Sequence, residues 1–164
     1  MRYYLFIISL LSFHITGFSQ SSATARFTAS IQIIEPIEIK TLSNMNFASI
    51  DAGKGGTVTL SPENLRSATG EIQLEESAGQ TPAIFEIKGQ SQYSYQVALP
   101  QQAYLIAPNA EPILIKDFVA LNDHQTFNSN AQLIRLGASL EISEGQSPGQ
   151  YRSAAPIEIT VSYN

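Results

Sequence analysis

Short runs in which apolar and polar residues alternate constrain the fold more than any other feature of this sequence. The most regular run closes the sequence, where Ile157, Ile159, Val161 and Tyr163 alternate with polar residues. A period of two places these four side chains on one face of a β-strand. Beyond the leading apolar run, no segment sustains the three-and-four spacing of a helix. The sequence therefore predicts an all-β protein.

Strand-like runs recur along the chain and are separated by turn-forming residues. They occupy residues 27–39, 56–61, 71–76, 83–89, 93–100, 112–122, 126–143 and 157–164. Short strands with turns at such spacing are typical of a sandwich or barrel, and alternation favours a sandwich because each strand gives one face to a shared core. We expect an immunoglobulin-like Greek-key β-sandwich of about seven to nine antiparallel strands.

The N-terminus has the pattern of a secretory signal peptide. Arg2 precedes an almost unbroken apolar run over residues 3–15, and the small residues Gly17 and Ser19 follow it. The apolar run is shorter than the roughly 20 residues of a spanning helix. The pattern predicts a signal peptide over residues 1–19 and a single domain over residues 20–164. The domain would be exported to the periplasm, the cell surface or the extracellular space, without a stable membrane span.

Composition excludes several classes of partner and cofactor. Fourteen acidic residues outnumber nine basic ones, for a net charge of −5, which argues against nucleic acid as a partner. The sequence has no cysteine and only two histidines, one of them in the predicted signal peptide. Zinc and copper would lack their preferred ligands. We expect no disulfide, no metal and no cofactor.

Motifs for catalysis are weak. His124 could form a triad with Asp117 or Asp123, but no nucleophile elbow is present, and a solvated loop histidine is the simpler interpretation. Gly53-Lys54 lacks the spacing of a phosphate-binding loop and fits a hairpin turn. We expect a protein that is not an enzyme.

Tyr151 is a candidate tyrosine corner. It follows the turn formers Pro148 and Gly149 and precedes the closing strand. In Greek-key sandwiches such a tyrosine bonds its hydroxyl back to the backbone. The alternative is an ordinary aromatic residue at the start of a strand.

Several motifs, in order, resemble one family. They are Asn-Phe-Ala-Ser-Ile (46–50), Gly-Gly-Thr-Val (55–58), Arg-Ser-Ala-Thr-Gly (66–70) and Pro-Gly-Gln-Tyr (148–151). With these motifs the chain resembles the secreted bacterial domain of unknown function 4402. That family carries no established activity or catalytic residues to transfer. Its closing hairpin is similar in turn to those of spore-coat U-like proteins and chaperone–usher pilus subunits.

The resemblance to pilus subunits implies assembly by strand addition, in which the N-terminal extension of one subunit completes the sheet of its neighbour. The candidate donor side chains are Phe27, Ala29, Ile31 and Ile33, which alternate with polar residues after the signal peptide. The acceptor strand would be the closing one. Against this, the chain has no disulfide pair, and Gly149 departs from the usual spacing. The alternative is that residues 25–33 are the first strand of a complete sandwich.

These observations favour a structural, pilin-like or adhesion component that acts through strand edges. Its partners would be copies of itself or other surface subunits. The alternative function is a glycan-binding module, for which Tyr93 and Tyr95 on one strand face would stack on a sugar ring. Two aromatic residues on one face are also explained by core or cross-strand packing.

Overall fold

The computed structural model describes residues 21–75, 79–121 and 124–164, so the predicted signal peptide lies outside the described residues. The chain divides into two units, residues 1–33 and residues 34–164. In the first unit, residues 21–33 form no strand and all their side chains are exposed. The second unit, the folded body, carries strands β1 to β13.

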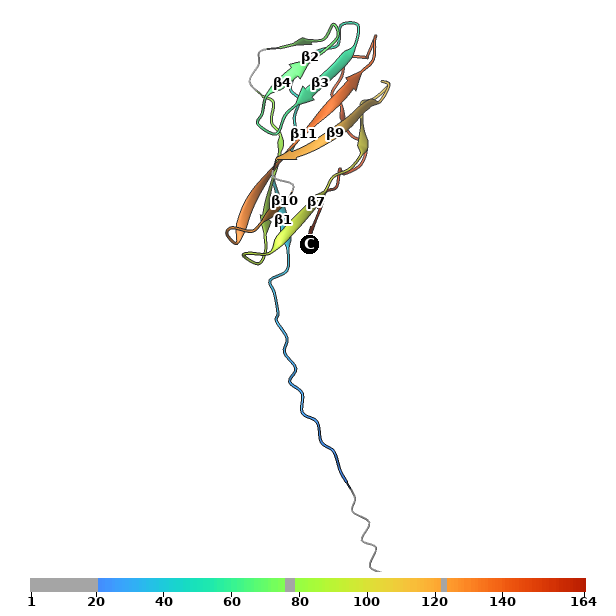
Figure 1. The fold of residues 1–164 in the computed structure, drawn as a ribbon. Helices are drawn as coiled ribbons and strands as arrows, with labels where there is room; N and C mark the ends of the chain where they lie inside the picture. The colour runs from blue at the N-terminus through green and yellow to red at the C-terminus, as the bar shows by residue number, and fades with distance from the viewer. Residues whose placement is uncertain (1–20, 76–78, 122–123) are drawn as a thin grey trace, which may run out of the picture. The chain divides into compact units, whose positions relative to one another are not determined.

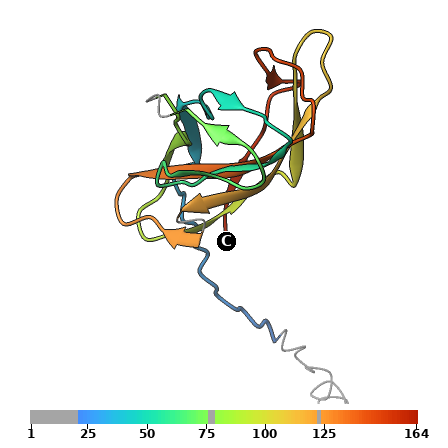
Figure 2. The same ribbon diagram turned by 90° about the horizontal axis from the view of Figure 1, so that it is seen from above.

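The main sheet of the body is built around β11 (Ala131–Ile142), which crosses it diagonally in Figure 1. One edge of β11 pairs first with β6 (Ala83–Lys88) and then with β3 (Gly56–Leu60). Its other edge pairs with β9 (Ile113–Leu121). The sheet is completed by β1 (Glu38–Ser43), β4 (Arg66–Ala68), β8 (Gln102–Ile106) and β12 (Arg152–Ser153). It curls into a half-barrel (Figure 2).

Two smaller sheets accompany the main one. The first has the order β10 (His124–Thr126), β7 (Ser94–Ala98) and β13 (Thr160–Tyr163), and the second pairs β2 (Ile50–Asp51) with β5 (Gln73–Leu74). All strand pairings are antiparallel.

The core consists of two apolar clusters that follow the alternation of β11. Every second residue of that strand from Ile134 to Ile142 is buried. The first cluster contains Phe47, Val58, Leu60, Ile113, Ile115, Ala138, Leu140 and Ile142. The second contains Ile87, Tyr95, Val97, Phe127 and Ile134, with residues of β7 and the half-buried side chains of β13 packed against the main sheet.

A β-bulge in β9 reverses which residues of that strand face the core. Asp117 has a positive φ of 52°, and the register with β11 shifts at this point. Ile115 is buried before the bulge, whereas Phe118 and Ala120 pack on the core after it. A single extra residue moves the inward phase from odd to even positions.

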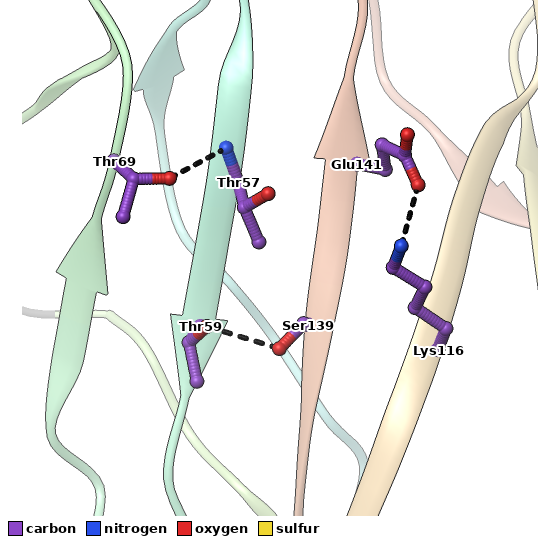
Figure 3. A network of polar contacts seen from close by, with 6 residues as sticks. All are labelled: Thr57, Thr59, Thr69, Lys116, Ser139 and Glu141. Atoms are coloured by element: carbon purple, nitrogen blue, oxygen red, sulfur yellow. Dashed lines mark hydrogen bonds and ion pairs between the residues drawn. The ribbon is translucent and has the colours of Figure 1, made fainter.

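Polar contacts on the main sheet join β3, β11, β9 and Thr69, which directly follows β4 (Figure 3). The Thr57 amide donates to the Thr69 hydroxyl over 3.3 Å, and the Thr59 and Ser139 hydroxyls lie 2.9 Å apart. Lys116 pairs with Glu141 at 2.8 Å, and this carboxylate raises the pKa of the lysine. These side chains support cross-strand pairing.

The prediction of an all-β protein with antiparallel strands is confirmed. Its main sheet is a curled half-barrel, and the immunoglobulin-like sandwich stays a prediction. The expected strand count was too low, because β2, β4, β5, β10 and β12 have only two or three residues each. A run of two or three residues is too short for an alternating pattern to be recognised in the sequence.

Replacing Gly137 by alanine should destabilise the body. A Cβ atom at this buried position would meet the carbonyl oxygen of Leu60 and the ring of Pro62, and backbone cannot move aside as a flexible side chain can. We expect a loss of about 1–3 kcal/mol in the free energy of unfolding, measured by urea denaturation. In Gly149→Ala the nearest atom is 3.4 Å away, so this control should remain close to wild type.

Candidate functional site

A groove opens at the border between the main sheet and the C-terminal part of the chain. It is lined by Ile39 and Thr41 of β1, Phe85 of β6, and residues 157–159, and encloses about 220 Å³. We call it the edge groove. Engineered apolar cavities of about 150 Å³ hold a benzene ring. The edge groove therefore has room for a large apolar side chain.

One wall of the edge groove is β1, an end strand of the main sheet. β1 pairs with β6 on one side and, among the described residues, with no strand on the other. Ile39 lies opposite Ile87, which is fully buried, yet Ile39 itself is 42% exposed. The inner face of the sheet is therefore left uncovered along β1.

The opposite wall is formed by residues 157–159. They begin the terminal segment, residues 157–163, which ends in β13 (Thr160–Tyr163). β13 pairs with β7 and is an end strand of its own sheet. Its predicted alternation is present: Ile157, Ile159, Val161 and Tyr163 are half-buried, and the residues between them are exposed. None of the four is fully buried, and among the described residues β13 pairs with no strand other than β7.

Tyr163 ties the two walls together at one end of the groove. Its hydroxyl donates to the Glu35 carbonyl over 2.7 Å and accepts from the Gln90 amide over 2.7 Å. Its ring packs edge-on against Tyr93, with the centroids 5.6 Å apart. Because Glu35 lies beside Tyr163 while Ile39 lies beside residues 157–159, the two walls run antiparallel.

The candidate donor side chains lie in the N-terminal arm, residues 25–33. Phe27, Ile31 and Ile33 are 92%, 88% and 87% exposed, and Ala29 is exposed too. Residues 25–33 form no strand in this unit, and β1 of the body begins at Glu38. The arm therefore carries an alternating apolar pattern without forming a strand.

Residues 37–163 match the family described as domain of unknown function (DUF4402). The chain belongs to this family. The match covers β1 and the terminal segment, whereas the arm precedes it. No curated protein and no solved structure matches the chain.

Tyr93 and Tyr95 do not form an exposed aromatic platform. Tyr95 is 1% exposed, lies against Phe127 with centroids 4.6 Å apart, and donates its hydroxyl to Gln132 over 2.9 Å. Tyr93 is half-buried against Tyr163. Both rings belong to the packing at the end of the β7 sheet, as the core interpretation has it.

Tyr151 makes the hydrogen bond of a tyrosine corner. Its hydroxyl donates to the Ser147 carbonyl, four residues upstream, over 2.7 Å, and accepts from the Gln146 amide over 2.9 Å. The ring packs against the first core cluster. Tyr151 therefore fixes the turn that leads into the terminal segment.

No catalytic or metal-binding arrangement stands out among the described residues. They contain no cluster of three His, Cys, Asp or Glu side chains suited to a metal, and no helix long and apolar enough to span a membrane. Gly53 and Lys54 lie in a turn, where Lys54 pairs with Glu71 at 3.1 Å. Asp123 lies outside the described residues, and β10 begins at His124.

The sequence identified one wall of the edge groove and missed the other. Residues 157–163 were expected to form an edge strand from their own alternation. Ile39 and Phe85 were placed only in strand-like runs and Thr41 in none, because their position opposite the terminal segment depends on contacts across more than 70 residues of chain. No local sequence signal encodes that pairing.

Removing the Tyr163 hydroxyl should loosen the closed end of the groove. Tyr163→Phe keeps the ring but leaves the Glu35 carbonyl and the Gln90 amide without their partner. We expect the free energy of unfolding to fall by about 0.5–1.5 kcal/mol in urea denaturation, because water can reach the freed groups. Tyr104→Phe, at a tyrosine that is 48% exposed, is the control and should change stability by no more than about 0.5 kcal/mol.

Stability should also fall at high pH through Tyr95. Burial raises the pKa of Tyr95 above its ordinary value of 10.0. Between the unfolded and folded pKa values the folded state binds more protons, so the free energy of unfolding decreases as pH rises above about 10. Urea denaturation between pH 8 and pH 11, at about one-unit steps around the ordinary tyrosine pKa, should show a steeper loss for wild type than for Tyr95→Phe. Equal slopes would contradict this role.

Proposed function

We propose that the chain is an exported, non-catalytic protein of the cell surface or periplasm that acts through its strand edges as a structural, pilin-like or adhesion component. The observation that carries this proposal is the pairing of two features in one chain. One is a groove between the end strand β1 and residues 157–159, which precede β13, and the other is an exposed arm with alternating apolar residues. Unpaired edges template the addition of another strand.

Other features support the same proposal. The apolar leader over residues 1–19 would direct export. The packing of β7 and β13 against the main sheet through the second core cluster fits an immunoglobulin-like sandwich with one strand missing. A sandwich that lacks a strand gains stability when a partner supplies it.

The proposal predicts self-association that depends on the apolar face of the arm. Residues 20–164 should form concentration-dependent oligomers in light scattering. The double variant Ile31→Ser/Ile33→Ser should shift the population to monomer, because both side chains are nearly fully exposed in the single chain and gain burial only in a partner.

The matched control changes the other face of the same arm. Ser30→Ala/Gln32→Ala leaves the apolar residues in place and should retain the oligomers. A wild-type protein that stays monomeric at every concentration would reject strand-edge self-assembly. Equal loss in both double variants would reject a role for the apolar face.

A further inference from the structure

We propose that the body pairs face to face with a second copy of this chain through one half of the outer face of its main sheet. The contact is a closed, two-fold dimer in which Arg135 of β11 in each copy lies opposite Glu86 of β6 in the other. This inference goes beyond the proposed function, because the contact uses the face of a sheet and leaves the strand edges free.

The outer face of the main sheet has two halves of different character. The half near β3 and β4 is largely polar and carries the hydroxyl and charged side chains of Figure 3, which bond to one another. The half formed by β6, the start of β11 and the end of β9 is largely apolar. Leu133 on β11 is 50% exposed, and Val119 and Leu121 on β9 are 56% and 40% exposed. The solvated face of an antiparallel sheet normally carries polar residues, so the apolar half indicates a surface that a partner covers.

Strand register gathers the side chains of the apolar half. Arg135 lies between Leu121 of β9 and Ile84 of β6. Two residues along β11, Leu133 lies opposite Glu86. On each strand, residues that face the core alternate with these five, so all five project from the outer face. We call these five residues the outer patch.

The charges of the outer patch identify a second copy as its occupant. Arg135 and Glu86 lie on one diagonal of a four-residue unit, and Leu133 and Ile84 lie on the other diagonal. A two-fold axis along the apolar diagonal exchanges the two ends of the charged diagonal. Arg135 then faces Glu86 of the second copy, and this pair occurs twice. An isologous contact requires such self-complementarity, and arginine is enriched at interfaces of this kind.

Both charged side chains are able to meet across the contact. Packed sheets lie about 10 Å apart, a distance that an arginine and a glutamate from opposite sheets span together. Glu86 already pairs with Lys88 through Oε2, at 3.5 Å, but a carboxylate accepts from two cations through its two oxygens. With this axis the strands of the two copies cross steeply, as in orthogonal sheet packing.

The contact is small, so the dimer is a weak one. Small interfaces belong to transient complexes that form only at high protein concentration. In dilute solution a chain that cannot assemble through its arm is therefore monomeric, and the dimer appears on concentration.

Charge reversal in separate chains tests the contact. Arg135→Glu gives the outer patch two acidic side chains, and Glu86→Arg gives it two basic ones. Each variant alone should raise the dissociation constant of the dimer by at least about tenfold, because like charges then face each other. An equimolar mixture of the two variants should associate again, because an acidic patch then meets a basic one. A role within one chain cannot produce this recovery.

All variants are made in the full chain carrying Ile31→Ser/Ile33→Ser, so that the arm does not contribute to assembly. Sedimentation equilibrium from about 1 μM to about 1 mM measures association. Urea denaturation checks that each variant is folded. The matched control is Lys116→Glu mixed with Glu141→Lys, the same reversals on the polar half of the same face. These two variants, alone and mixed, should dimerise as the background protein does.

The outcomes separate this contact from the proposed function. A background protein that sediments as a monomer at every concentration would overturn the dimer. Loss of association in both single variants without recovery in the mixture would overturn the facing of Arg135 and Glu86, as would equal loss in the control variants. A protein with the native arm that forms dimers and no larger species would reject assembly through the arm and leave the face-to-face contact standing.

Discussion

The antiparallel pairing along β11 is the constraint on which the body depends. This strand of twelve residues contacts β6, β3 and β9 through its two edges, and its inward side chains contribute to both core clusters. On one edge of β11 the partner strand changes from β6 to β3 halfway along, so the sheet has two parts that meet there. One half bears the first core cluster, and the other half, with β6 and β1, leads to the edge groove.

The alternation of apolar and polar residues was sufficient to predict the strands that bury one face and expose the other. Residues 83–89 and 93–100 became β6 and β7, and residues 157–163 show the expected inward and outward sides. Two other features of the fold could not be predicted from the sequence. The bulge at Asp117 lies within a run that looks continuous, and the strand at Gln102–Ile106 follows a proline. Both are decided by neighbouring strands, whose pairing overrides local preference.

Only part of the candidate site could be predicted from the sequence, because long-range strand pairing also decides its geometry. The arm and the terminal segment are each amphipathic by themselves, so their sequences mark them as strand material. Ile39, Thr41 and Phe85 form one wall because β1 pairs with β6, a strand that is distant in the sequence. This pairing places Thr41 opposite Phe85. Long-range pairing of this kind creates the free edge, and the residues of β1 do not indicate which segment lies across it.

Estimated free energies favour an acceptor site that pairs with the arm on both of its edges over a site that pairs on one edge. Burying Phe27, Ile31 and Ile33 contributes roughly 1.5–3 kcal/mol each. Fixing the backbone of nine arm residues costs about 1–2 kcal/mol per residue, which exceeds that contribution. Backbone hydrogen bonds, at about 0.5–1.5 kcal/mol net each, must supply the difference. A strand on one edge pairs half of its backbone groups, whereas a strand paired on both sides pairs all of them, so under the proposed strand-edge assembly pairing on both sides would offset the cost of ordering the arm better than pairing on one.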